Sequence, residues 1–130
     1  MLFYVFVEID LTNVRSVLGE ENLTVEDLLC YVLAKVYSKV NWRRIARGRD
    51  SLDVFQHRVL ASAYQPSFSR FLEKLCRSLG VQSVRVESEV LEYLNKHSDY
   101  VLNMIRHNSI YLVVKMYDIY KRLRDLKKSE

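Results

Sequence analysis

Turn-forming residues are scarce in this sequence, which has three glycines and one proline in 130 residues. Antiparallel β proteins need turn residues about every ten positions, so this scarcity argues against them. It favours long helices joined by short connections. Apolar residues make up 49% of the chain and charged residues 28%, a balance that excludes a disordered chain. We therefore expect one compact, mainly α-helical domain spanning residues 1–130.

Residues that commonly carry chemistry are also few. Cys30 and Cys76 lie in apolar helical patterns without a CxxC motif, which favours buried thiols in a reducing setting over a disulfide. Three scattered histidines and two distant cysteines give no zinc spacing. The sequence contains no Walker loop, no GxGxxG and no GxSxG. We therefore expect a protein without catalytic activity, metal, cofactor or small-molecule substrate.

Long hydrophobic runs are missing as well. No apolar stretch approaches the roughly 20 residues that a membrane-spanning helix needs. The first ten residues, MLFYVFVEID, lack a basic segment and include Glu8, so they do not read as a signal peptide. These features predict a cytoplasmic protein that does not bind membranes. The low glycine content, with abundant Glu, Lys, Arg and Tyr, is typical of a thermophile.

Helical spacing of apolar residues predicts a bundle of about five helices. Asp10 or Thr12 can cap a short helix that ends at Gly19. The clearest helix start is at Thr24, where Asp27 completes a capping box. The expected helices are 24–40, 51–64, 66–79 (ended by Gly80), 88–107 with a kink or a new cap near Ser98, and 109–128.

Two short segments have the composition of β-strands. Residues 3–9 are dense in aromatic and β-branched side chains. In residues 81–87, Val84 and Val86 alternate with polar residues. The sequence therefore allows a small strand pair beside the helices, although both segments also suit helix ends.

Charge is unevenly distributed along the chain. Residues 1–28 carry a net charge of −5, residues 29–84 carry +7, and residues 85–130 carry +2. The basic middle contains one tryptophan beside a cluster of arginines, and the helix expected at 66–79 adds cations at i, i+4 and i+7. The candidate nucleic-acid-binding residues are Trp42, Arg43, Arg44, Arg47, Arg49, Arg70, Lys74 and Arg77.

This cluster has two interpretations. Guanidinium groups bind phosphate in a fork geometry, and an adjacent aromatic ring can stack on an unpaired base of RNA or single-stranded DNA. Alternatively, the arginines pair with the acidic N-terminal third and form a solvated, salt-bridged face. No recognised nucleic-acid-binding motif accompanies them, so the pattern is suggestive but not specific.

Two other polar groupings have structural explanations. Asp50, Asp53 and His57 would share one helix face, but Asp50 suits an N-cap and Asp53 a first-turn acid. His97 and His107 suit packing and helix C-terminal positions.

The last helix contains a short heptad pattern that indicates a contact seam, either within the chain or between two copies. The candidate dimer residues are Leu112, Met116, Ile119, Leu123 and Leu126. Tyr111, Tyr117 and Tyr120 alternate with cations there, which is typical of a core boundary and also of single-strand binding. The sequence thus predicts a nucleic-acid-associated module or accessory subunit. The alternative is a homodimeric protein-interaction or scaffold domain.

Overall fold

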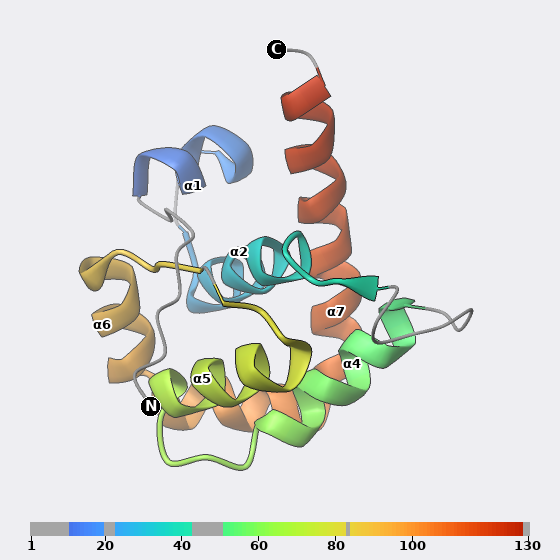
Figure 1. Cartoon of the computed structure of the whole chain (residues 1–130). Helices are drawn as coiled ribbons and strands as arrows, with labels where there is room; N and C mark the ends of the chain where they lie inside the picture. Colours follow the sequence, from blue (N-terminus) through green and yellow to red (C-terminus); the bar gives the residue numbers. More distant parts are fainter. Residues whose placement is uncertain (1–10, 20–22, 43–50, 83, 129–130) are drawn as a thin grey trace.

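The computed structural model describes residues 11–19, 23–42, 51–82 and 84–128, which form a compact helical bundle (Figure 1). The helices, labelled as in Figure 1, are α1 Leu11–Leu18, α2 Val25–Tyr37, α4 Ser51–Ser62, α5 Phe68–Leu79, α6 Ser88–Lys96 and α7 Ser98–Lys128. The expectation of a mainly α-helical bundle is confirmed. Within the described residues, no helix is both long and apolar enough to cross a membrane.

Helix α2 lies at the centre of the bundle, because nearly every side chain from Leu28 to Tyr37 is buried. A helix that is apolar all round must be covered on all sides. It begins with the predicted capping box: Thr24 Oγ1 accepts from the Asp27 amide at 3.0 Å, and the Thr24 amide donates to Asp27 Oδ2 at 3.1 Å. These bonds satisfy two groups at the helix start that would otherwise lack partners.

Helix α7 is the longest element and bends sharply at Asn108, whose backbone angles leave the helical region (φ −136°, ψ 35°). Figure 1 shows its first half (orange) running behind α5 and its second half (red) rising past α2. The first half contacts the α4–α5 connection through Arg106, and the second half contacts α2 through Leu112 and Lys115. The restart predicted at Ser109 is therefore real, although the two halves remain one element.

Helix α5 has firmly defined ends. Ser67 caps its start by accepting from the Arg70 amide at 3.2 Å. At its other end Gly80 adopts a left-handed conformation (φ 70°), and the Val81 amide donates to the Cys76 carbonyl at 2.9 Å. This is the Schellman arrangement that a C-terminal glycine predicts. The helix therefore starts two residues after Pro66 and ends where the sequence indicates.

Ser98 separates α6 from α7, but its hydroxyl does not act as the predicted cap of α7. It accepts from the Phe68 amide at 2.9 Å and donates to the Asn95 carbonyl at 2.6 Å. Asn95 in turn accepts from the Ser69 amide at 2.8 Å. The junction of α6 and α7 thus supplies acceptors to the first turn of α5, which no local sequence pattern reveals.

The predicted strand pair is not found in the part of it that the structure describes. Residues 3–9 lie outside the described residues. Among the described positions of 81–87 there is no strand, only an isolated β-bridge at Val86. Val81 instead completes the end of α5, and Val84 is fully buried in the helical core. The described residues of 81–87 are therefore a connecting segment with buried valines, and they form no strand.

Candidate nucleic-acid interface

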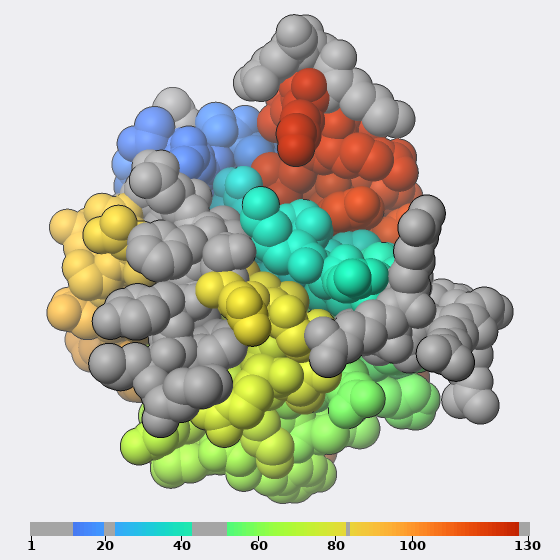
Figure 2. All heavy atoms as spheres, in the orientation of Figure 1, coloured from blue at the N-terminus to red at the C-terminus, as the bar shows by residue number. Residues whose placement is uncertain are grey.

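The outer face of α5 carries the described part of the predicted phosphate-binding set. One side of this strongly amphipathic helix is buried, and Arg70, Lys74 and Arg77 all lie on the exposed side. Because an α-helix rises about 1.5 Å per residue, these cations span about 10 Å along its axis. Figure 2 shows α5 (yellow-green to yellow) at the front of the molecule. The predicted clustering on one face is therefore present in α5.

Few acids offset this basic face. Arg70 lies 3.6 Å from Glu73, and its side chain remains 68% exposed. An exposed pair of this kind contributes little energy and leaves the guanidinium accessible. Among the described residues, no carboxylate pairs with Lys74 or Arg77. The face therefore presents an excess of positive charge to solvent.

The Trp42 ring is not a fully exposed surface on which a base could stack freely. Its ring is half-buried, 5.0 Å from the Tyr37 ring and 6.4 Å from the Phe55 ring, measured between centroids. Tyr37 also contacts Tyr117 and Tyr120 of α7. Trp42 thus packs into an aromatic cluster that joins α2, α4 and α7. This packing is a structural role for Trp42, and its role in base stacking stays a prediction.

The arginines that follow Trp42 lie outside the described residues. These are Arg43, Arg44, Arg47 and Arg49. The segment that contains them is bounded by Trp42 on one side and by α4 on the other, and both boundaries pack on Tyr37 through Trp42 and Phe55. Their participation in a phosphate site stays a prediction.

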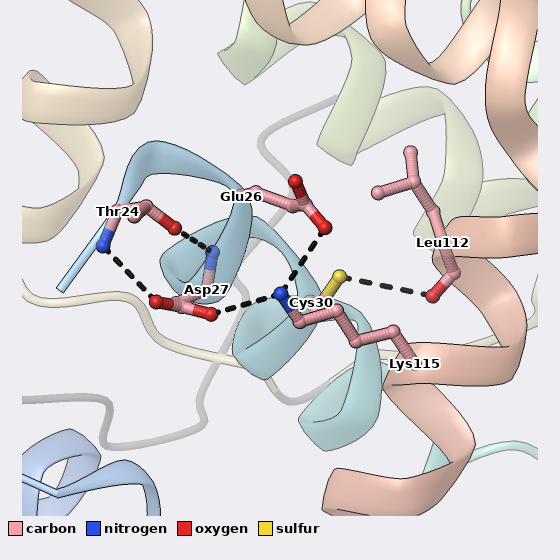
Figure 3. A network of polar contacts seen from close by, with 6 residues as sticks. All are labelled: Thr24, Glu26, Asp27, Cys30, Leu112 and Lys115. Atoms are coloured by element: carbon pink, nitrogen blue, oxygen red, sulfur yellow. Dashed lines mark hydrogen bonds and ion pairs between the residues drawn. The ribbon is translucent and has the colours of Figure 1, made fainter.

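The two described acids of the N-terminal third have a different partner. Lys115 Nζ lies 3.1 Å from Glu26 Oε1 and 3.0 Å from Asp27 Oδ1 (Figure 3). Burial disfavours the Lys115 ammonium, but hydrogen bonds to Asp27 and Glu26 outweigh it and raise the pKa of Lys115. These two carboxylates are therefore neutralised by α7 and not by a cation of α5. Glu8, Asp10, Glu20 and Glu21 lie outside the described residues.

The two cysteines are structural. Both are free and buried, and burial raises the pKa of each thiol to about 12. Cys30 Sγ donates to the Leu112 carbonyl at 3.7 Å, within the same α2–α7 contact (Figure 3). A thiol with so high a pKa is a poor nucleophile and a poor metal ligand at neutral pH.

The described histidines and acids form no group that could hold a metal ion. Asp53 and His57 are both exposed on α4, and Asp50 lies outside the described residues. His97 follows α6 and packs edge-on against Tyr93, with 4.8 Å between ring centroids. His107 is exposed just before the bend in α7.

The heptad seam of the last helix faces the chain's own core. Leu112, Met116 and Ile119 are buried, Leu123 is half-buried, and Leu126 is 49% exposed. The first three side chains cannot contact a second copy while the chain keeps this fold. Of the two interpretations of the seam, the internal one holds at these positions, because they cover the apolar surface of α2.

Two surface features were not predicted from the sequence. Ile110, Tyr111 and Val114 form a small exposed apolar patch next to the bend at Asn108. An open cleft also lies between the α4–α5 connection and the first half of α7, with Arg106 on its wall. In the sequence, only apolar residues that lie outside the heptad seam indicate the patch. No local sequence pattern indicates the cleft.

Comparisons with protein-family models, with curated proteins and with solved structures found no match to this chain.

Proposed function

We propose that this protein is a non-enzymatic, helical nucleic-acid-associated module or accessory subunit that binds the phosphate backbone of RNA or single-stranded DNA. The observation that carries the proposal is the exposed face of α5, where Lys74 and Arg77 have no acidic partner among the described residues and Arg70 has only an exposed one. Such a face attracts a polyanion and releases its counterions. Arg43, Arg44, Arg47 and Arg49 lie outside the described residues and stay predicted members of the nucleic-acid-binding set.

The α2–α7 contact supports this proposal for the two described acids of the N-terminal third. Glu26 and Asp27 pair with Lys115. Among the described residues, these two carboxylates therefore do not neutralise the cations of α5.

The test is a titration of wild-type protein with single-stranded RNA and DNA at low and high salt. Replacing Arg70, Lys74 and Arg77 together with Ala should weaken binding at low salt by about tenfold or more, because each lost phosphate contact removes counterion release. These side chains are exposed, so the fold should persist.

The matched control replaces Lys96, Arg122 and Lys127 with Ala. These residues are also exposed, and among the described residues none of them forms an ion pair. The control removes the same net charge from α6 and α7. An equal loss in both variants would mean that total charge alone attracts the nucleic acid, and the α5 assignment would then be wrong.

A second candidate function is homodimerisation through α7, which the patch of Ile110, Tyr111 and Val114 favours. Sedimentation at several concentrations should show a dimer, and Ile110→Glu with Val114→Glu should give a stable monomer because both side chains are exposed. A wild-type monomer at all concentrations would exclude this function. The buried seam residues Leu112 and Met116 would not serve in such a test, since their replacement unfolds the core.

A further inference from the structure

The open cleft beside Arg106 is formed by residues from two distant parts of the chain. Gln65 and Pro66 come from the α4–α5 connection, and the first half of α7 supplies Asp99, Tyr100, Leu102, Asn103 and Arg106. Its volume of about 510 Å³ falls within the range of small-molecule sites, roughly 300–1,000 Å³. In Figure 1 these two segments lie along the lower edge of the molecule, beside the start of α5.

Arg106 is held in place at the wall of this cleft. Its Nε donates to the Ala63 carbonyl at 3.2 Å, and its guanidinium carbon lies 5.2 Å from the centre of the Tyr64 ring. Both contacts restrict a side chain that otherwise loses much rotamer freedom on binding. No carboxylate among the described residues pairs with Arg106, so its terminal nitrogens remain available to a ligand.

Two tyrosines beside the cleft are unusually exposed for large aromatic side chains. Tyr64 is 65% exposed and Tyr100 is 59% exposed. Neither belongs to the buried core, and each has a flat apolar ring in contact with water. Exposed rings beside a cleft are typical platforms for stacking a planar ligand.

The polar groups of the cleft suit the edge of a nucleobase. The side-chain amides of Gln65 and Asn103 both donate and accept, and in the described part of the chain neither makes a hydrogen bond. The Asp99 carboxylate accepts from N–H groups, and its charge offsets that of Arg106. The cleft is therefore better matched to a neutral, flat ring with donors and acceptors than to a phosphate group alone.

We propose that this cleft binds one unpaired base of a single-stranded nucleic acid, which stacks on Tyr64 or Tyr100 and hydrogen-bonds to Asn103 and Gln65. This inference rests on the proposed function and adds to it the preference for single strands. Phosphates of the same strand would contact the basic face of α5, whose first turn follows Pro66 in the chain.

The test compares a single-stranded thymidine oligonucleotide with a base-free oligomer of the same length and phosphate number. Wild-type protein should bind the oligonucleotide about tenfold more tightly, because one stacked base contributes that much or more. Tyr64→Leu with Tyr100→Leu should lose this preference and keep its affinity for the base-free oligomer. The control, Tyr93→Leu, replaces an exposed tyrosine elsewhere and should keep the preference.

The outcomes separate this inference from the proposed function. If wild type binds both oligomers equally, or the Tyr64 and Tyr100 variant keeps the preference, the cleft assignment is wrong and the phosphate-binding function stands. If wild type binds neither oligomer, both proposals fail. The side-chain amide signals of Asn103 and Gln65 should shift in NMR spectra on adding the oligonucleotide. A response to an unstructured peptide instead would assign the cleft to a protein partner and overturn the inference.

Discussion

The Lys115 ammonium lies 3.0 Å from the Asp27 carboxylate, which joins the second half of α7 to the first turn of α2. Asp27 also completes the capping box with Thr24, so one carboxylate both starts α2 and positions α7 against it (Figure 3). Glu26 adds a second contact to the same ammonium at 3.1 Å. Glu26 and Asp27 therefore have a structural use, and neither of them pairs with a cation of α5.

Replacing Lys115 with Met should destabilise the protein by about 1–2 kcal/mol. The change leaves Glu26 and Asp27 side by side and partly buried without their cation, while water screening limits the loss because the Lys115 side chain is 33% exposed. Urea unfolding measures the difference. Lys121→Met, which removes an exposed pair with Asp118, should cost less than about 0.5 kcal/mol. Equal effects of the two changes would contradict the role given to Lys115.

Stability should fall in acid because of Asp27. Partial burial raises the pKa of this carboxyl, but the Thr24 amide and Lys115 outweigh burial and lower the pKa below 3.8. A depressed folded pKa gives stability that is present above the unfolded pKa and is lost as pH falls through the folded value. Unfolding free energies between pH 6 and pH 2 should therefore drop less for Asp27→Asn than for wild type. Parallel pH curves would contradict this account.

The contact of Lys115 with Glu26 and Asp27 should also lose its stabilising effect in alkali. The pKa of Lys115 is raised, so its contribution is complete below the pKa of an unfolded lysine and is lost only as pH rises above that value. Between these limits the ion pair contributes a constant stability. In Lys115→Met the alkaline loss from this contact should be absent, and the acid loss should be smaller than in wild type, because the Thr24 amide still lowers the pKa of Asp27.

Trp42→Ala should destabilise the protein by about 2 kcal/mol, since it removes a half-buried ring from the cluster around Tyr37. Thermal unfolding followed by circular dichroism measures the loss. Tyr100→Ala, at an exposed position, is the control and should have little effect. If Trp42→Ala left stability unchanged but weakened nucleic-acid binding, Trp42 would be a base-stacking residue after all.

Cys30 and Cys76 should be unreactive in the folded protein. Both thiols are buried with a pKa of about 12, so little thiolate forms at pH 8 and the reagent lacks access. A thiol-reactive dye should label both sites only as fast as the protein opens, and denaturant should make both react at once. Rapid labelling of either cysteine in native buffer would contradict the packing of α2 or α5.

Local chemistry made part of the fold predictable. Thr24 and Asp27 encode the start of α2, and Gly80 encodes the end of α5, because caps depend on neighbouring residues. The heptad spacing of Leu112, Met116 and Ile119 identified an apolar face but not what covers it. Whether this face packs within the chain or against a second copy depends on α2, which is apolar on all sides and needs a partner.

The candidate site was less predictable for the same reason. The spacing of Arg70, Lys74 and Arg77 placed them on one helix face, which the fold confirms. The packing of Trp42 was not predicted, since its contacts with Tyr37 and Phe55 join separate helices. The cleft has no local pattern, because Gln65 and Arg106 meet only through the packing of α7 on the α4–α5 connection.

The most direct test of the central claim is the salt dependence of single-stranded RNA binding by wild type and by the Arg70, Lys74 and Arg77 to Ala variant. The slope of log K against log salt concentration is about −0.7 per phosphate contact, so loss of three contacts should make it shallower by about 2. The Lys96, Arg122 and Lys127 control should keep the wild-type slope. Identical slopes for wild type and the α5 variant, or no binding by wild type, would contradict a phosphate-binding face on α5.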